Sequence, residues 1–244
     1  MRYKRLILKL SVITATYNAV EHLPKLIESL RNQEDKDFEW VVADGASTDG
    51  TLELLQSITD LNIKISSQED FGIYDALNRA IKISSGEFYL VVGADDFLYP
   101  NAIKNYKSEI SGNFDIVTAS IKCGSKIYFA GCRGRSWFSG MAEYVSSHAV
   151  GAIYRRSLHD KFGFYSRKFP IAADQLFTLK AIRGGANVKI IKKEVGFFND
   201  SGVSSVDVLG TLTELYRIQL VLGQNKCVQT LLFILRLLKN YKKL

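Results

Sequence analysis

Strand-like and helix-like segments alternate through the first hundred residues, and this pattern constrains the fold more than any other feature of the chain. Short apolar runs alternate with segments whose apolar residues recur at helical spacing. The sequence predicts strands over 8–15, 38–43, 62–66 and 87–93, and helices over 22–32, 51–58 and 73–84. Such alternation is typical of a mostly parallel sheet covered by helices. We therefore expect an α/β fold.

The second half of the chain is less regular. The predicted elements are strands over 114–122, 126–130, 149–155 and 188–198, a helix over 174–183, and two last helices from 208 that are separated at 223–225. With 244 residues and 47% apolar side chains, the chain can form one large domain with a sizeable core. We expect a single α/β domain that ends in C-terminal helices.

Charge and composition argue against several classes of protein. Five basic residues and no acidic residue lie from position 226 onward, so the rest of the chain carries only +2 of the net charge of +7. Basic charge this localised argues against a nucleic-acid partner. No run approaches the roughly 20 apolar residues of a membrane-spanning helix. The basic N-terminus leads into an apolar run that Lys9 interrupts, which indicates a core strand and no targeting signal. Three cysteines without a CxxC pair do not indicate a disulfide framework or a zinc site.

Polar residues follow the predicted strands where those strands end. They are Thr16, Tyr17 and Asn18 after the first strand, Asp44 after the second, and Asp95 and Asp96 after the fourth. Ligand sites of such sheets lie at the carboxyl ends of the strands, so we expect these residues to lie at one edge. Two adjacent carboxylates after a buried run suit a divalent cation, which takes oxygen ligands. A solvated turn is the alternative.

Four stretches, in this order, resemble family 2 glycosyltransferases of the bacterial polysaccharide and O-antigen type. They are SVITATYNA (11–19), VVADGASTDGT (41–51), FGIYDALNRAIKISSGEFY (71–89) and GADD (93–96). The resemblance covers about residues 10–205 and implies the glycosyltransferase-A fold, a Rossmann-like, mostly parallel α/β domain. It also implies a catalytic domain over 1–205, with a nucleotide-sugar half (1–100) and an acceptor half (101–205), and a helical tail over 206–244.

The resemblance implies an activity as well. An enzyme of this family transfers a hexosyl or N-acetylhexosaminyl group from a nucleotide-diphosphate sugar to an acceptor hydroxyl, inverting the anomeric centre in one displacement. The implied cofactor is Mg²⁺ or Mn²⁺, and the implied acceptor is a lipid-linked or surface glycan. The expected location is the cytoplasm, with peripheral attachment to the inner face of the membrane.

The resemblance also assigns roles to residues. It implies Asp174 as the catalytic base, and Asp95 and Asp96 as metal ligands. The implied nucleotide-sugar-binding residues are Thr14, Tyr17, Asn18, Asp44, Asp75, Arg79, Ala94, Asp95 and His148. The chain departs from the family pattern at Gly93 and Ala173, where the family often carries acids.

Each assignment has a structural alternative. Asp44 could be a turn residue that bonds its own loop. Asp75 and Arg79 stand one helical turn apart and could form a surface pair. His148 could be a structural hydrogen-bond partner, and Asp174 could be a helix-start acid favoured by the helix dipole.

The last predicted helix is amphipathic and basic. Its apolar positions are Val228, Leu231, Leu232, Leu235 and Leu238, and its basic positions are Arg236, Lys239 and Lys243. A helix of this kind can lie on an anionic membrane surface. The alternative is that the apolar face packs on the domain's own core.

Three other functions deserve comparison with sugar transfer. A catalytically silent sugar-nucleotide-binding or scaffold protein is the main rival, because an acid is missing at position 93. A nucleotidyltransferase is less compatible, because the glycine-rich, lysine-bearing N-terminal loop is absent. A Rossmann dehydrogenase is less compatible still, because no GxGxxG follows the first strand.

Overall fold

The computed structural model describes residues 10–110, 112–131, 134–199 and 202–243. Positions 8 and 9 of the first expected strand lie outside these ranges. The first half contains the expected alternation: β1 (Leu10–Thr16), α1 (Leu23–Arg31), β2 (Phe38–Asp44), α2 (Thr51–Gln56), β3 (Ile63–Ser67), α3 (Ile73–Ile83) and β4 (Phe88–Val91).

The second half contains more short elements than the sequence predicted. In chain order they are β5 (Phe97–Leu98), α4 (Ala102–Glu109), β6 (Ile116–Cys123), β7 (Lys126–Tyr128), α5 (Ser136–Ser139), η1 (Gly140–Glu143), β8 (Ala152–Arg155), α6 (Leu158–Phe162), α7 (Ala173–Arg183), β9 (Val188–Phe197), α8 (Val203–Val206), α9 (Val208–Val221), α10 (Lys226–Asn240) and η2 (Tyr241–Lys243).

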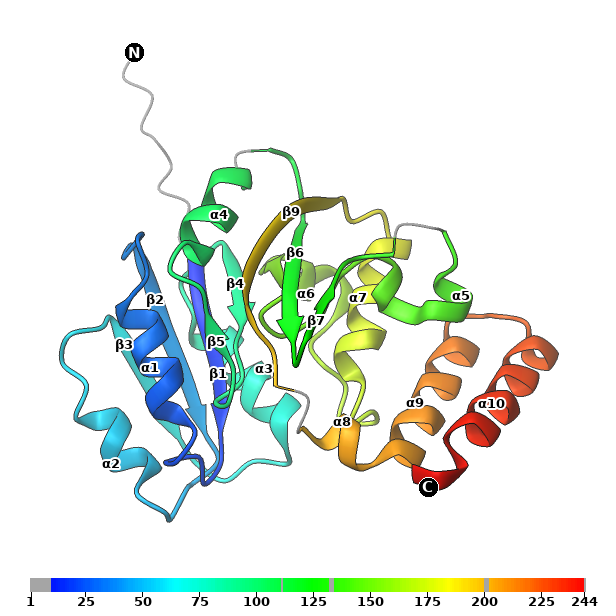
Figure 1. Ribbon diagram of the computed structural model, residues 1–244, viewed down its shortest axis with the longest axis horizontal. Helices are drawn as coiled ribbons and strands as arrows, with labels where there is room; N and C mark the ends of the chain where they lie inside the picture. Colours follow the sequence, from blue (N-terminus) through cyan, green and yellow to red (C-terminus); the bar gives the residue numbers. More distant parts are fainter. Residues whose placement is uncertain (1–9, 111, 132–133, 200–201, 244) are drawn as a thin grey trace.

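One sheet runs through both halves in the order β3-β2-β1-β4-β8-β6-β9-β5, and β7 pairs with β6 (Figure 1). The pairs among β3, β2, β1 and β4 are parallel. The sheet becomes mixed at β8, which runs antiparallel to both β4 and β6. The carboxyl ends of the parallel strands therefore meet at one edge, as expected.

Side chains alternate between two cores, one on each face of the sheet. In β2, Phe38, Trp40 and Val42 join the core beneath α1, α2 and α4, whereas Val41 and Ala43 join the core beneath α3, α6 and α7. This period of two is the geometry of a strand. Because both faces are covered by helices, β2 is buried at every position, and its middle, Trp40 to Ala43, is an unbroken apolar run.

The two last long helices form one end of the molecule (Figure 1). Helix α9 buries Ile218 in the second core, while α10 packs beside α9, with Tyr216 stacked on Phe233 at 5.0 Å. The predicted tail thus begins as part of the main body. Within the described residues, no helix combines the length and apolar character needed to cross a membrane.

Candidate active site

Two pockets lie side by side at the carboxyl edge of the parallel strands. The outer pocket, of about 640 Å³, is formed by the ends of β1 and β2 and the start of α3. The inner pocket, of about 380 Å³, reaches from the end of β4 to the start of α7. Both are lined by Ala15 and Ile73, so the two pockets adjoin at these residues.

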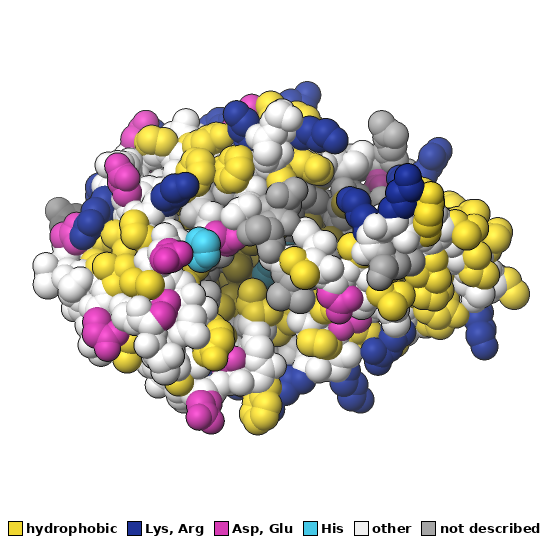
Figure 2. All heavy atoms as spheres, turned by 60° about the horizontal axis from the view of Figure 1, so that its bottom comes forward, with side chains coloured by type: hydrophobic (Ala, Val, Ile, Leu, Met, Phe, Trp, Pro, Cys, Tyr) yellow, Lys and Arg dark blue, Asp and Glu magenta, His cyan; other side chains and the backbone are white. Residues whose placement is uncertain are grey.

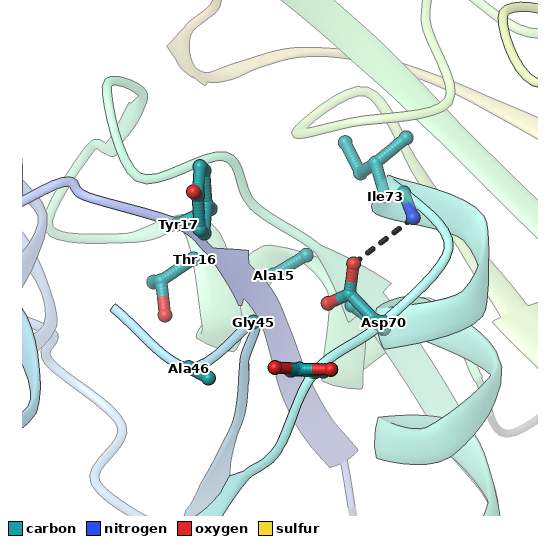
Figure 3. A pocket seen from close by; sticks show the side chains of 10 residues that line it. Ala15, Thr16, Tyr17, Gly45, Ala46, Asp70 and Ile73 are labelled. Atoms are coloured by element: carbon teal, nitrogen blue, oxygen red, sulfur yellow. Dashed lines mark hydrogen bonds between the residues drawn. The ribbon is translucent and has the colours of Figure 1, made fainter. Parts of the chain in front are cut away.

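The outer pocket combines an exposed aromatic ring with a carboxylate. Figure 3 shows Tyr17 and Asp70 on either side of Gly45. A Cβ at Gly45 would lie 2.9 Å from Asp70 Oδ2 and 3.3 Å from the Tyr17 ring, so glycine is what allows both side chains to approach. The Gly72 N–H donates to Asp70 Oδ1 at 2.9 Å and fixes the carboxylate. A ring and a fixed acceptor can stack on and hydrogen-bond a flat heterocycle.

Asp70 did not emerge from the sequence, although a signal for it exists. It comes shortly after the end of β3, as Asp44 stands at the end of β2, so the strand-end rule extended to the third strand reaches it.

Asp44 lies beneath the outer pocket and is fully buried. Its carboxylate accepts hydrogen bonds from the hydroxyls of Thr16, Ser47 and Ser67 and from the Ser47 N–H. Burial alone would raise the pKa of Asp44, but these hydrogen bonds outweigh burial and lower its pKa. This is the geometry of the alternative reading, an acid that organises its own loop.

Asn18 and Arg79 hold the loops of the outer pocket together. Asn18 adopts a left-handed conformation with φ 47°, and its side-chain oxygen accepts the Thr48 N–H at 2.9 Å. Arg79 donates to the backbone carbonyl of Asp44 at 2.6 Å and lies 3.9 Å from Asp70. The guanidinium therefore lies directly behind the pocket's carboxylate.

Asp75 and Thr14, two of the predicted binding residues, line neither pocket and bond to protein groups instead. Asp75 pairs with Arg167 at 2.5 Å, so the surface pair suggested with Arg79 does not form. Thr14 is fully buried and accepts a hydrogen bond from the indole N–H of Trp40 at 3.0 Å. The Thr14 hydroxyl therefore bonds a residue of the first core and lines neither pocket.

The strand-end acids Asp95 and Asp96 both line the inner pocket, but they have different environments. Asp96 is buried, and its two oxygens accept the backbone N–H groups of Gly93 and Asn199, each at 2.8 Å. Burial raises the pKa of Asp96 to about 7. Ala94 packs against the first core. Asp96 thus ties the end of β4 to the segment after β9.

The missing acid at position 93 has a local physical reason. A Cβ at Gly93 would lie 2.8 Å from Asp96 Oδ2 and 3.0 Å from Asp95 Oδ1. The first distance is shorter than real Cβ contacts and the second is tight, so a larger residue at 93 would require Asp96 to shift from its inward position.

Asp174 lies at the first turn of α7 and lines the inner pocket. Tyr74 donates to its Oδ1 at 2.7 Å, and its Oδ2 lies 4.0 Å from His148 Nδ1. His148 lines the same pocket and is buried. The pocket therefore holds a carboxylate with one oxygen held by Tyr74 and the other facing a histidine.

The described residues contain no group of three or more His, Cys, Asp or Glu side chains that could hold a cation unaided. Magnesium is usually held by one or two carboxylates together with substrate phosphates and water. Asp95, at the pocket wall next to the fixed Asp96, is an oxygen donor of that kind. The donor set fits a cation that is shared with a phosphate-bearing ligand.

Comparisons with known proteins agree with this architecture. The family model "Glycosyl transferase family 2" matches residues 11–163. The poly(ribitol-phosphate) beta-N-acetylglucosaminyltransferase TarS of Staphylococcus aureus is 29% identical over 210 residues, which cover 78% of this chain and 35% of TarS. The PGL/p-HBAD biosynthesis glycosyltransferase of Mycobacterium bovis is 28% identical over 199 residues, which cover 79% of this chain and 77% of that protein.

Solved structures share the fold. S. aureus TarS 1–349 in complex with UDP matches with a TM-score of 0.69 and 25% identity, covering 96% of this chain and 72% of that chain. The mannosyltransferase PcManGT from Pyrobaculum calidifontis, in complex with GDP-Man and Mn²⁺, matches with a TM-score of 0.67 and 18% identity, covering 86% and 62%. The expected glycosyltransferase-A fold is confirmed. Since the family match spans the strands whose ends form both pockets, the chain belongs to glycosyl transferase family 2.

Proposed function

We propose that this chain transfers a sugar from a nucleotide-diphosphate sugar to an acceptor hydroxyl, with inversion of the anomeric centre. The observation that carries the proposal is the pair of adjoining pockets that share Ala15 and Ile73. The side chains of the two pockets suit an extended donor. Its nucleobase would lie beside Tyr17 and Asp70 in the outer pocket, and its diphosphate and sugar would lie in the inner pocket. The complex of TarS with UDP supports a donor of this class.

Asp174 is the proposed general base. In the proposed step, the acceptor oxygen forms a bond to the anomeric carbon while the bond from that carbon to the diphosphate breaks. The acceptor's proton goes to Asp174 Oδ2, and the electron pair of the broken bond leaves with the nucleoside diphosphate. Tyr74 holds Oδ1, so the base keeps one orientation during the reaction.

Asp95 is the residue that would hold Mg²⁺ or Mn²⁺, together with phosphate oxygens and water. When bound, such a cation neutralises the charge that develops on the departing diphosphate. Asp96, whose oxygens already accept two backbone hydrogen bonds, supports the loop that carries Asp95. This structural role suits Asp96 better than the ligand role suggested by the sequence.

A donor-binding protein without transfer activity is the second candidate. It is favoured by Gly93 and Ala173, which stand where the family often carries acids. The two candidates differ in whether bound donor is turned over.

The test compares the wild type with Asp174→Asn in the presence of UDP-sugars, GDP-sugars and Mg²⁺ or Mn²⁺. We expect donor binding to be unchanged in the variant and release of nucleoside diphosphate to fall about a hundredfold, because the loss of a base affects the chemical step. A proportional loss of affinity and rate would make Asp174 a binding residue. Donor binding by the wild type without any turnover would support the second candidate.

We also propose that α10 seats the enzyme on an anionic bilayer surface, near a lipid-linked acceptor. The apolar face predicted for this helix is largely exposed, with Leu231 at 58%, Leu235 at 51% and Leu238 at 64%, so it does not pack on the domain's core. Figure 2 shows hydrophobic side chains gathered at this end of the molecule, with Lys and Arg side chains near them.

The opposite face of α10 holds the helix to the body. Gln229 is buried and donates to the Trp137 carbonyl at 2.8 Å. Arg236 donates to the Phe138 carbonyl, and burial lowers the pKa of Arg236. Arg236 therefore belongs to the packed face and not to the basic surface suggested by the sequence.

The basic residues beside the exposed apolar face of α10 favour an anionic membrane surface as its partner. Lys239, Lys242 and Lys243 are exposed at the end of α10 that carries Leu238. A basic margin around an apolar stripe complements an anionic headgroup layer, at roughly 1 kcal/mol for each basic residue. A neutral protein partner would gain nothing from those lysines.

A further inference from the structure

Buried hydrogen bonds form a chain behind the inner pocket, from Gly163 to His148. His159 Nδ1 lies 3.1 Å from the Gly163 carbonyl, and its Nε2 lies 2.9 Å from the Tyr89 hydroxyl. That hydroxyl lies 2.7 Å from the Tyr165 hydroxyl, which lies 2.7 Å from His148 Nε2. All four side chains are buried, so water does not compete for these bonds.

The chain of hydrogen bonds has a fixed direction. The Gly163 carbonyl can only accept, so His159 carries its proton on Nδ1. Burial lowers the pKa of His159 to about 4, so the ring is neutral near pH 7 and its Nε2 accepts from Tyr89. Each hydroxyl has one proton, so Tyr165 donates to Tyr89, and His148 Nε2–H donates to Tyr165.

This direction leaves a lone pair on His148 Nδ1. Burial lowers the pKa of His148, so near pH 7 the ring carries only the proton on Nε2. The unprotonated Nδ1 lies 4.0 Å from Asp174 Oδ2, and while Asp174 is ionised both atoms are acceptors, so no hydrogen bond joins them. Once Oδ2 gains a proton, the two groups become a matched donor and acceptor.

We propose that His148 is a positioning residue whose Nε2–H tautomer is set by the Tyr165–Tyr89–His159 chain, so that Nδ1 accepts a hydrogen bond from protonated Asp174. This inference rests on the proposed role of Asp174 as the base. The proton moves from the acceptor hydroxyl to Asp174 Oδ2 and remains bonded there, directed at Nδ1. His148 thus stabilises Asp174 in its protonated form, which is the product of the proton transfer, and itself stays neutral.

The backbone beside His148 is consistent with an imposed geometry. Val150 has φ 63°, and a β-branched residue rarely adopts this left-handed conformation. It is held there because its N–H donates to the Val91 carbonyl at 2.7 Å and its own carbonyl accepts the Tyr106 hydroxyl at 2.7 Å. Such strain persists where the surrounding structure fixes a functional conformation.

Nitrogen NMR of the histidine rings tests the tautomers without any activity measurement. The chain has three histidines, and the exposed His22 can be assigned by His22→Gln. We expect opposite tautomers for the two buried rings, with Nδ1–H on His159 and Nε2–H on His148. The same tautomer on both rings, or a doubly protonated His148 near pH 7, would overturn the inference.

A substitution at Tyr89, which is two hydrogen bonds away from His148, tests whether the tautomer of His148 affects catalysis. Tyr89→Phe frees the Tyr165 proton to turn toward His148 Nε2, so we expect the Nδ1–H tautomer of His148 to appear. The turnover number should fall about tenfold, equivalent to ~1.4 kcal/mol, with the donor KM unchanged. His148→Gln should reduce turnover to a similar extent, because it keeps a donor for Tyr165 and removes Nδ1.

Tyr154→Phe is the matched control. Tyr154 is another buried tyrosine, stacked on Tyr89 at 5.7 Å, but its hydroxyl bonds Thr178 outside the chain. It should leave turnover and the His148 spectrum unchanged, and an equal loss in Tyr154→Phe and Tyr89→Phe would indicate general damage to the core. If Tyr89→Phe has the Nδ1–H tautomer on His148 and still turns over at the wild-type rate, the role of His148 is overturned and the proposed function is not. Donor binding without turnover would overturn the proposed function, and the role of His148 with it.

Discussion

At the residue scale, Asp70 and Asp75 lie close in sequence and have different surroundings. Asp70 lines the outer pocket beside Tyr17, whereas Asp75 pairs with Arg167 and lines neither pocket.

Asp70→Asn would keep the acceptor for the Gly72 N–H and replace the second oxygen with a donor. We expect UDP or GDP, whichever the wild type prefers, to bind about tenfold more weakly, measured by calorimetry. Asp75→Asn is the control and should bind normally; equal weakening in both variants would contradict the placement of the base beside Asp70.

The same two pockets show what the sequence can and cannot determine about single residues. The strand-end rule identifies the edge where acids gather, and it finds Asp44, Asp95 and Asp96. It does not tell which acid faces a ligand, because that depends on hydroxyl donors from other segments. Ser67, on a different strand, helps turn Asp44 inward, and the Asn199 N–H does the same for Asp96 from 103 residues away.

Glu39 gives a pH-dependent prediction. It is buried in β2 and accepts hydrogen bonds from Lys64, Ser11 and the Ser85 N–H. Burial alone would raise the pKa of Glu39, but these bonds lower it from 4.5 to about 2. Because the folded-state pKa is the lower one, the stability that Glu39 contributes is present above about pH 4.5 and is lost as the pH falls toward 2.

The measurement is the free energy of unfolding in urea as a function of pH. The wild type should lose stability between about pH 4.5 and pH 2 more steeply than Glu39→Gln, which has no proton to gain there. Parallel curves would show that Glu39 is not the responsible group.

At the scale of elements, α9 helps to place the proposed base. Glu214 of α9 is buried, and its Oε2 accepts the backbone N–H groups of Ile171 and Ala172 at 3.1 and 2.8 Å, directly before α7. Glu214→Gln removes the charge from these bonds, so we expect a loss of about 1–2 kcal/mol in unfolding free energy and a lower turnover number. Glu28→Gln, on the exposed side of α1, should change neither. Reduced turnover at full stability would still support the placement role, whereas no change in either quantity would contradict it.

The predictability of each element followed its length and periodicity. In the first half, apolar runs mark the buried strands and helical spacing marks α1 and α3, and the sequence located all seven elements within a few residues. Elements such as β5, with two residues, and α6, with five, are too short to show a period. They exist because β9 and the second core provide their partners, which lie far away in the sequence.

At the scale of the whole molecule, the surface of α10 can be tested by moving charge without removing the helix. Lys239→Glu, Lys242→Glu and Lys243→Glu combined should abolish co-sedimentation with vesicles containing phosphatidylglycerol at low salt. The control reverses the exposed Lys25, Lys82 and Lys126, which changes the net charge equally on α1, α3 and β7. This control should still bind. Equal loss in both variants, or no binding by the wild type at low salt, would exclude a specific membrane surface on α10.

The sequence predicts the class of the whole fold, whereas the place of each C-terminal helix depends on its tertiary contacts. The resemblance led us to separate residues 206–244 as a tail, yet α9 buries Ile218 in the second core. The pattern of α9 looks like that of any surface helix, because the sequence does not show which helix covers an exposed edge of a core. Helix α10, by contrast, keeps its apolar face largely exposed.

The inward turn of Asp96 also affects how this chain could change through evolution or engineering. Gly93→Asp alone would place a Cβ 2.8 Å from Asp96 Oδ2, so restoring the acid common in the family requires Asp96 to shift. Position 96 would first have to give up its bonds to the Gly93 and Asn199 N–H groups, which join β4 to the end of β9. We therefore expect the two positions to be epistatic, with Gly93→Asp costing less stability when position 96 carries a smaller side chain than when it carries Asp96.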